Sequence, residues 1–191
     1  MKTLTEFDAR LRELIPFESR LRPFVCEGNP IDCEIFIVGI NAATPLSGPF
    51  WLDWDATLGF NYQQWLQTYL SERGGTASNT RQRLFAFTRA AAPRKVLETN
   101  LWPMATGKAS TLRREDKNSM IFDFLVQAIR PKVIVTHGKP PSDYLSQHGR
   151  KLSHGAHVIN AERHAAYISV ARAEELGREA ALLASKLPVQ S

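Results

Sequence analysis

Short strand-like runs that alternate with segments of helical periodicity constrain the fold of this chain more than any other feature. The first run, Ile35–Val38, is continuously apolar and ends at Gly39, which is typical of a strand buried on both faces of a sheet. Strands that alternate with helices in this way indicate a parallel sheet with helices on both faces. We therefore predict one domain over residues 1–191 with a three-layer α/β/α fold and a central four-stranded parallel sheet. The other predicted strands are Lys95–Thr99, Pro131–Gly138 and Ala156–Asn160.

Apolar residues at helical spacing predict the helices around these strands. The most regular pattern spans Asp116–Ile129, and Pro16 ends the first predicted helix. The remaining predicted helices are Thr3–Ile15, Phe60–Leu70, Arg81–Ala91, Pro141–Gln147 and Val170–Leu187.

Charge and cysteine content limit the partners and the compartment. The chain has 24 Lys and Arg residues against 19 Asp and Glu residues, a net charge of +5. An excess of this kind suits an anionic partner such as nucleic acid, but a basic protein without such a partner has the same balance. Cys26 and Cys33 indicate a reducing compartment with no disulfide framework. With no apolar signal core and no membrane-spanning window, we expect a cytoplasmic protein that does not enter a membrane.

Several common chemistries lack their motifs. The chain has no GxGxxG after a strand, no GxxxxGK[ST] and no GxSxG, so dinucleotide, P-loop and hydrolase-elbow chemistry are not indicated. The five histidines form neither HxxxH nor HExxH, and the two cysteines lack metal-knuckle spacing. We expect neither a metal nor an organic cofactor.

Polar residues follow three of the predicted strands. Asn41 lies just beyond the first strand, Asn100 closes the second, and His164 comes shortly after the fourth. Ligands of parallel α/β sheets bind beyond the carboxyl ends of the strands. We therefore expect these three residues on one rim of the sheet.

Four short sequence motifs follow one another along the chain. They are "VGIN" after a buried strand, a strand ending in "TNLWP", "VIVTHG" before a helix, and a late histidine before the last helix. In this order they resemble the uracil-DNA glycosylase superfamily, over roughly Glu34–Leu187. The likeness is closest to the mismatch-specific and single-strand-selective branches, whose first motif reads Gly-hydrophobic-Asn-Pro-Gly. This chain departs from the pattern twice. "INAAT" stands where Asn-Pro-Gly is usual, and "HAAY" stands where the family has His-Pro-Ser.

The resemblance implies an enzyme that hydrolyses the N-glycosidic bond of uracil, or of a related deaminated base, flipped out of DNA. Asn41 would position the attacking water, and His164 would donate to O2 of the leaving base. An alternative alignment uses His154 in place of His164. The resemblance further implies a base-binding group made of Gly39, Ile40, Phe50 and Asn100.

Within that group, Asn100 would read the base edge through its amide. Phe50 would stack on the extruded base, with Trp51 or Trp54 as alternatives. Each of these residues also has a purely structural interpretation. Asparagines often stabilise turns, and aromatic side chains most often pack in a core.

The segment around the late histidine also implies DNA contacts. Tyr167 or Ile168 would fill the gap left in the base stack, and Arg163 and Arg172 would hold phosphates. The basic stretch Lys108–Arg114 lies on the same rim, where it would follow the DNA strand or form an ordinary polar loop.

Two other functions remain open at this point. One is a catalytically inactive protein of the same fold that binds nucleic acid or nucleobases, and it would allow Trp51 or Tyr167 to fill the pocket. The other is an unrelated parallel α/β enzyme, which would place Asp53, Asp55 or Glu98 at the pocket floor. Our preferred hypothesis is the DNA glycosylase, acting as a monomer.

Overall fold

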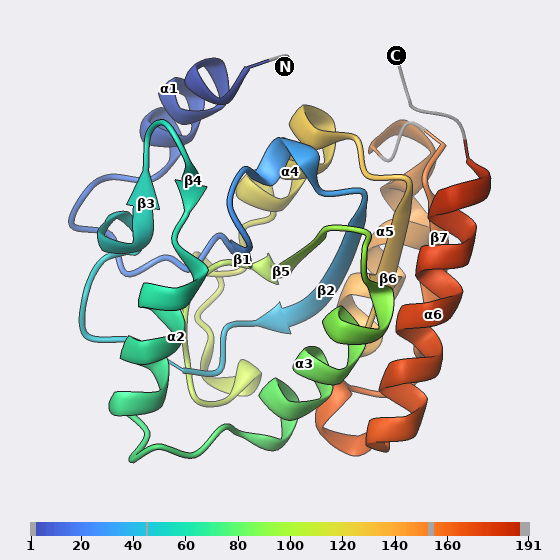
Figure 1. The fold of residues 1–191 in the computed structure, drawn as a ribbon. Coiled ribbons are helices and arrows are strands. Elements are labelled where there is room, and N and C mark those ends of the chain that lie inside the picture. The colour runs from blue at the N-terminus through green and yellow to red at the C-terminus, as the bar shows by residue number, and fades with distance from the viewer. Residues whose placement is uncertain (1–2, 45, 153–154, 188–191) are drawn as a thin grey trace.

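A mixed sheet of five strands forms the centre of the protein in the computed structural model, which describes residues 3–44, 46–152 and 155–187 (Figure 1). The strand order is β1-β5-β2-β6-β7, and the strands β5, β2, β6 and β7 are mutually parallel. The bounds are β1 Phe24–Cys26, β2 Ile35–Asn41, β5 Val96–Trp102, β6 Val133–Thr136 and β7 His157–Asn160.

The prediction of a purely parallel, four-stranded sheet is wrong at one edge. All four predicted strands are present, but β1 adds a fifth that runs antiparallel to β5. A strand of three residues is too short to show a periodicity, and it is fixed by tertiary contacts instead. Thr99 Oγ1, for example, donates a hydrogen bond to the carbonyl oxygen of Pro23 at 2.7 Å.

Helices cover both faces of the sheet, as the sequence predicts (Figure 1). Apolar residues of α3 and α6, such as Phe87 and Leu176, pack with Ile35 and Val133 on one face. Residues of α1, α4 and α5, such as Leu11, Phe122 and Leu145, pack on the other. The bounds are α1 Leu4–Leu14, α2 Tyr62–Ser71, α3 Asn79–Ala91, α4 Met120–Ile129, α5 Lys139–Leu152 and α6 Val170–Lys186.

Two helices differ from their predicted lengths by more than one turn, whereas the others agree within two residues. α4 begins at Met120, because the side chain of Asn118 accepts a hydrogen bond from the Met120 amide and residues before it form a turn. α5 begins at Lys139 and runs through Pro140 and Pro141, which the first turn of a helix tolerates since its amides have no intrahelical partner.

Short elements fill the long connection between β2 and α2. They are the 3-10 helix η2 (Phe50–Asp53) and the two-stranded ribbon of β3 (Trp54–Asp55) and β4 (Gly59–Phe60). Three further 3-10 helices are η1 Pro30–Asp32, η3 Ala109–Thr111 and η4 Ala165–Tyr167. Among the described residues, no helix is long and apolar enough to cross a membrane.

Candidate functional site

A pocket of about 120 Å³ opens at the carboxyl edge of the sheet. Its lining includes Asn41 from the end of β2, Asn100 from β5, His137 directly after β6 and His164 from the loop after β7. The prediction that Asn41, Asn100 and His164 share one rim is confirmed. An apolar cavity of about 150 Å³ can hold a benzene ring, so this pocket is on the scale of one planar ring.

The side chain of Asn41 has a fixed orientation. Its Nδ2 donates hydrogen bonds to the carbonyl oxygen of Thr106 at 3.0 Å, to Thr106 Oγ1 at 2.9 Å and to the carbonyl oxygen of Ala42 at 3.2 Å. Carbonyl oxygens only accept, so the amide nitrogen must face them. Oδ1 of Asn41 therefore faces the other way, and it makes no hydrogen bond within the described chain.

The side-chain amide of Asn100 has no hydrogen-bond partner among the described residues, although Asn100 lines the pocket. An asparagine that only stabilised its own turn would be bonded to that turn, and this one is not. Its Oδ1 lies over Gly39, where an added Cβ would come within 2.7 Å of it. Gly39 thus lies beneath the pocket wall, while the Ile40 side chain lies against Gly138 rather than in the pocket lining.

His164 lines the pocket as a neutral imidazole. Its Nδ1 accepts a hydrogen bond from the Ala166 amide at 3.2 Å, within the turn of η4. Burial lowers the pKa of His164, so its ring is neutral at pH 7. A neutral imidazole whose Nδ1 accepts must carry its proton on Nε2. The alternative residue, His154, lies outside the described residues.

His137 forms a second imidazole beside the first, with the two ring centroids 4.9 Å apart and the planes at 79°. The Ala165 amide donates to His137 Nδ1 at 3.4 Å. Burial, and then the positive charge that His164 carries when it is protonated at low pH, lowers the pKa of His137 to about 3. This ring is also neutral, and it too carries its proton on Nε2.

Aromatic side chains line the deeper part of the pocket. Phe50 is among them, but its ring also stacks on Phe60 with the centroids 5.6 Å apart. Trp51 donates from Nε1 to the Ile15 carbonyl oxygen, and Trp54 donates to Asp8. These two tryptophans hold α1 and its end to the core and are not part of the pocket lining.

Tyr167 and Ile168, the two residues predicted to fill the gap in the base stack, have different environments in the loop after β7. Tyr167 is 78% exposed, with its ring 6.1 Å from that of His164. Ile168 packs against the core instead, and its carbonyl oxygen accepts a hydrogen bond from Arg83. Arg163 is exposed and makes no ion pair within the described ranges, whereas Arg172 pairs with Glu175 at 3.2 Å.

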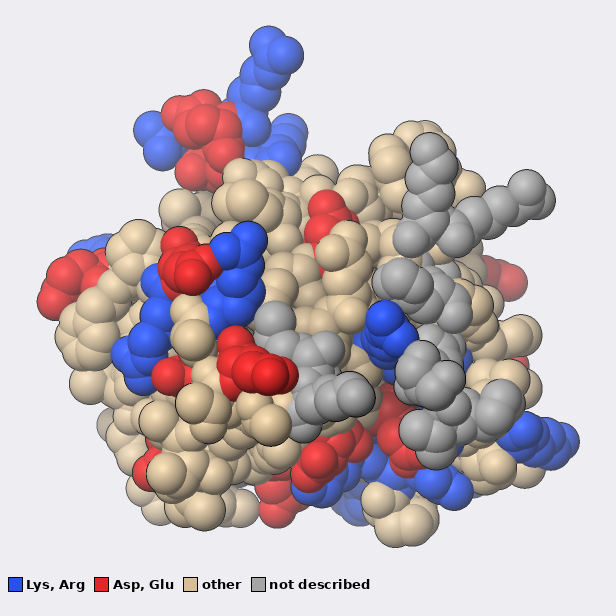
Figure 2. All heavy atoms as spheres, turned by 90° about the horizontal axis from the view of Figure 1, so that it is seen from above, with Lys and Arg blue, Asp and Glu red and all other residues tan. Residues whose placement is uncertain are grey.

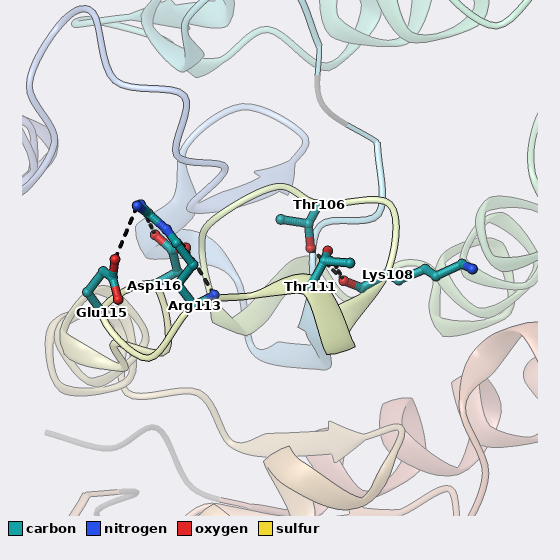
Figure 3. A network of polar contacts seen from close by, with 6 residues as sticks. All are labelled: Thr106, Lys108, Thr111, Arg113, Glu115 and Asp116. Carbon is teal, nitrogen blue, oxygen red and sulfur yellow. Dashed lines mark hydrogen bonds and ion pairs between the residues drawn. The ribbon is translucent and has the colours of Figure 1, made fainter.

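The loop after β5 forms a polar network (Figure 3). Thr106 Oγ1 and Thr111 Oγ1 each donate to the carbonyl oxygen of Lys108, at 2.9 and 2.7 Å. The Lys108 side chain points away from this network, while Arg113 is paired with Glu115 and Asp116. Of the basic residues in this stretch, Lys108 is therefore better placed than Arg113 to contact a phosphate.

Two carboxylates also line the pocket, namely Glu98 and Asp53. Glu98 is bound to Arg81 in a largely buried ion pair, and the Arg81 guanidinium lies 4.6 Å above the Trp65 ring centroid. Burial raises the pKa of Asp53 to about 6, and Arg22 opposes this shift. An arginine thus lies close enough to each carboxyl group to oppose its negative charge. Asp55 is exposed and does not line the pocket.

Arg22 also holds the loop that follows β2. It donates from one terminal nitrogen to the carbonyl oxygen of Leu46 at 2.8 Å and to that of Gly48. The long loop after Asn41 is therefore anchored at its far end by the segment that leads into β1.

The end of the molecule opposite the pocket holds both termini and carries charges of both signs. β2 runs from the upper right of Figure 1 towards the lower left, so its carboxyl end faces away from the end that holds both termini. Figure 2 looks down on that upper end, and in its coloured part Lys and Arg are interspersed with Asp and Glu. Within the described ranges, no three His, Cys, Asp or Glu residues are grouped so that they could hold a metal ion.

Sequence reasoning missed Thr106, His137, Arg22 and Arg81 as parts of this site. The "VIVTHG" motif contains His137, and its place directly after a strand was the available signal. Nothing local marks Thr106, which reaches Asn41 across 65 positions of sequence. Comparisons with family models and with curated proteins found no match to this chain.

Proposed function

We propose that this protein is a DNA glycosylase that removes uracil, or a related deaminated base, from DNA during base-excision repair. The observation that carries the proposal is that Asn41, whose Nδ2 is bonded to Thr106, and His164, whose Nδ1 is bonded to the Ala166 amide, line one ring-sized pocket. The strand order of β5-β2-β6-β7, with these residues at the carboxyl edge, supports a uracil-DNA glycosylase-like fold.

In the proposed reaction a flipped base enters the pocket. Asn41 Oδ1 accepts a hydrogen bond from a water and orients its oxygen towards C1′ of the sugar. The bond from this oxygen to C1′ forms as the glycosidic C1′–N bond breaks, and the base leaves with the bonding electron pair. The water proton passes to solvent, since an amide is too weak a base to take it. His164 stabilises the negative charge that develops on O2.

The amide of Asn100 is suited to read uracil. Its Oδ1 accepts from N3–H and its Nδ2 donates to O4, and cytosine offers the reverse pattern at these atoms. Phe50 provides an aromatic wall on the deeper side of the pocket. Gly39 leaves room for Asn100 Oδ1 and the His137 ring at the pocket wall, and Ile40 packs against Gly138.

DNA is the partner in this proposal. The exposed ring of Tyr167 fills the gap in the stack, and Arg163 and Lys108 contact phosphates on either side of the pocket. Ile168 supports the loop from below, and Arg172 contributes less because Glu175 neutralises it. The proposed enzyme acts as a monomer and requires no cofactor.

The test is an excision assay on labelled oligonucleotides, single- and double-stranded, that carry one uracil, hypoxanthine or xanthine. Alkali then breaks the chain at abasic sites. We expect cleavage at the modified base by the wild type and none by Asn41→Ala, while both bind DNA. Equal cleavage by Asn41→Ala would exclude water positioning by this residue. No cleavage of any substrate at high enzyme concentration and low salt would exclude the glycosylase.

A second candidate is an α/β enzyme unrelated to the glycosylases that acts on another small ligand. The presence of Glu98 and Asp53 in the pocket lining favours it, because carboxylates at a pocket repel DNA phosphates. The same assay separates the two, since this candidate predicts no abasic product from any of the oligonucleotides.

A further inference from the structure

His137 lines the pocket beside His164, and the proposed reaction does not use its polar atoms. It is 5% exposed and lines the pocket with Asn41, Asn100 and His164. A buried polar group costs free energy unless it finds a partner, so its place beside a ligand-sized cavity calls for an explanation. No hydrogen bond to its Nε2 is found within the described chain.

The two histidines are held in the same way by one loop. The consecutive amides of Ala165 and Ala166 donate to Nδ1 of His137 and to Nδ1 of His164. Each of these bonds leaves the proton of a neutral ring on Nε2. The loop therefore fixes two imidazoles in the tautomer that donates from the far side of the ring.

The free edge of His137 lies next to the acceptor of Asn100. A Cβ added to Gly39 would lie 2.8 Å from His137 Cε1, 3.0 Å from His137 Nε2 and 2.7 Å from Asn100 Oδ1. The donor of His137 and the oxygen of Asn100 thus overlie the same point of β2. Next to that oxygen, the Asn100 amide carries its own donor, Nδ2.

These groups form a sequence of donor, acceptor and donor along the pocket wall. A cyclic imide presents the complementary sequence, which is a carbonyl oxygen, an N–H and a second carbonyl oxygen. In uracil these are O2, N3–H and O4. If Asn100 Oδ1 accepts from N3–H and Nδ2 donates to O4, the atom that falls beside His137 is O2.

We propose that His137 is a second donor to O2 of the base, acting beside His164, so that the site selects bases with an imide edge. This inference rests on the proposed function. O2 has two lone pairs and gains negative charge as the base departs, so both donors strengthen during the reaction. Uracil and xanthine carry the imide edge. Hypoxanthine has C2–H in place of the second carbonyl group, and cytosine lacks the N3–H.

The first test measures binding of two free ligands by calorimetry, uracil and barbiturate. Barbiturate has an imide edge on a ring that is anionic at neutral pH, so it represents the departing base. We expect His137→Phe to weaken barbiturate binding about 10- to 100-fold and uracil binding less. His137→Gln, which keeps an N–H donor, is expected to recover part of the loss. The matched control is His148→Phe, because His148 is exposed on α5.

The second test compares excision of uracil and of 5-fluorouracil. Fluorine withdraws electrons and makes the base a better leaving group, so it needs less stabilisation. Removal of one such donor typically lowers kcat by about 100- to 1000-fold. We expect His137→Phe to lower the single-turnover rate for uracil by about 100-fold and the rate for 5-fluorouracil by less.

The outcomes separate the inference from the proposed function. Barbiturate binding that depends on His137, in a protein that excises no base, would refute the glycosylase and retain the imide site. Excision by the wild type with equal losses for uracil and 5-fluorouracil in His137→Phe would refute the donor role alone and point to simple packing. No barbiturate binding by the wild type, or equal binding by both proteins, would overturn the inference.

Discussion

The side-chain nitrogen of Asn41 is held by both oxygens of Thr106, at 3.0 and 2.9 Å. Thr106 Oγ1 in turn donates its own proton to the Lys108 carbonyl oxygen (Figure 3). Towards Asn41, this oxygen can therefore only accept a hydrogen bond. The loop after β5 thereby decides which atom of the Asn41 amide faces the pocket.

Thr106→Val is expected to lower the excision rate by about 10- to 100-fold, since small misplacements of a reacting group have costs of that order. Valine has nearly the same shape as threonine and keeps the backbone carbonyl oxygen, but it lacks the hydroxyl group that accepts the second hydrogen bond from Asn41. Thr106→Ser keeps the hydroxyl group and should retain most of the rate. A single-turnover assay measures both, and equal rates for Thr106→Val and wild type would contradict the role of this residue.

Gly39→Ala is expected to abolish base binding. Its Cβ would lie 2.7 Å from Asn100 Oδ1 and 2.8 Å from His137 Cε1, and a contact below 3.0 Å forces a displacement. Gly107→Ala is the matched control, because a Cβ at that position has no heavy atom within 4 Å. Calorimetric titration with uracil compares the two variants. Binding by Gly39→Ala as tight as that of the control would show that the pocket lies elsewhere.

Asn100→Asp should weaken uracil excision by about 10-fold or more, because the carboxylate loses the donor to O4 and repels the leaving anion. The free energy of unfolding should fall as well, by about 1–3 kcal/mol, because Asn100 is half-buried and a carboxylate there loses part of its hydration. Excision and urea unfolding are measured on the same samples. A large loss of stability with unchanged selectivity would indicate a structural role instead.

Acidification is expected to destabilise the protein through His137. Its pKa is about 3 in the folded state against an ordinary value of 6.5, so between these values the unfolded chain binds a proton that the folded chain does not. The free energy of unfolding therefore falls as the pH falls, by about 2 kcal/mol between pH 8 and pH 5 from this group alone.

Asp53 acts in the opposite direction over part of this range. Its pKa is raised to about 6, so it favours the folded state as the pH falls from 6 towards 3.8. The effect of His137 must therefore be read as a difference between the wild type and His137→Gln. Urea unfolding at pH 5 and pH 8 gives this difference, and parallel pH profiles for the two proteins would disprove it.

Sequence patterns predicted the layers of the fold because each layer follows from local periodicity. The continuous apolar run before Gly39 and the amphipathic pattern of α4 place their residues without reference to the rest of the chain. β1 could not be predicted in this way, since three residues show no period and its pairing with β5 depends on distant contacts.

The features of the site also fall into two groups, those that local sequence predicts and those that only the folded chain brings together. Asn41, Asn100 and His164 could be placed on one rim because the ends of parallel strands meet there. The tautomers of the two histidines, the clamp of Thr106 on Asn41 and the arginine partners of Glu98 and Asp53 depend on side chains brought together only by folding. Trp51 and Trp54 show the same limit, since local sequence did not reveal that they hold α1.

The clamp between Asn41 and Thr106 joins positions 65 residues apart, and the bond from Ala165 to His137 spans 28. Contacts between such distant positions require the intervening strands to be in register first, and chains rich in them fold slowly. A partly folded chain with its helices formed would still lack the pocket. Nucleobase binding during refolding should therefore appear only at the final stage, after the helical signal of circular dichroism has returned.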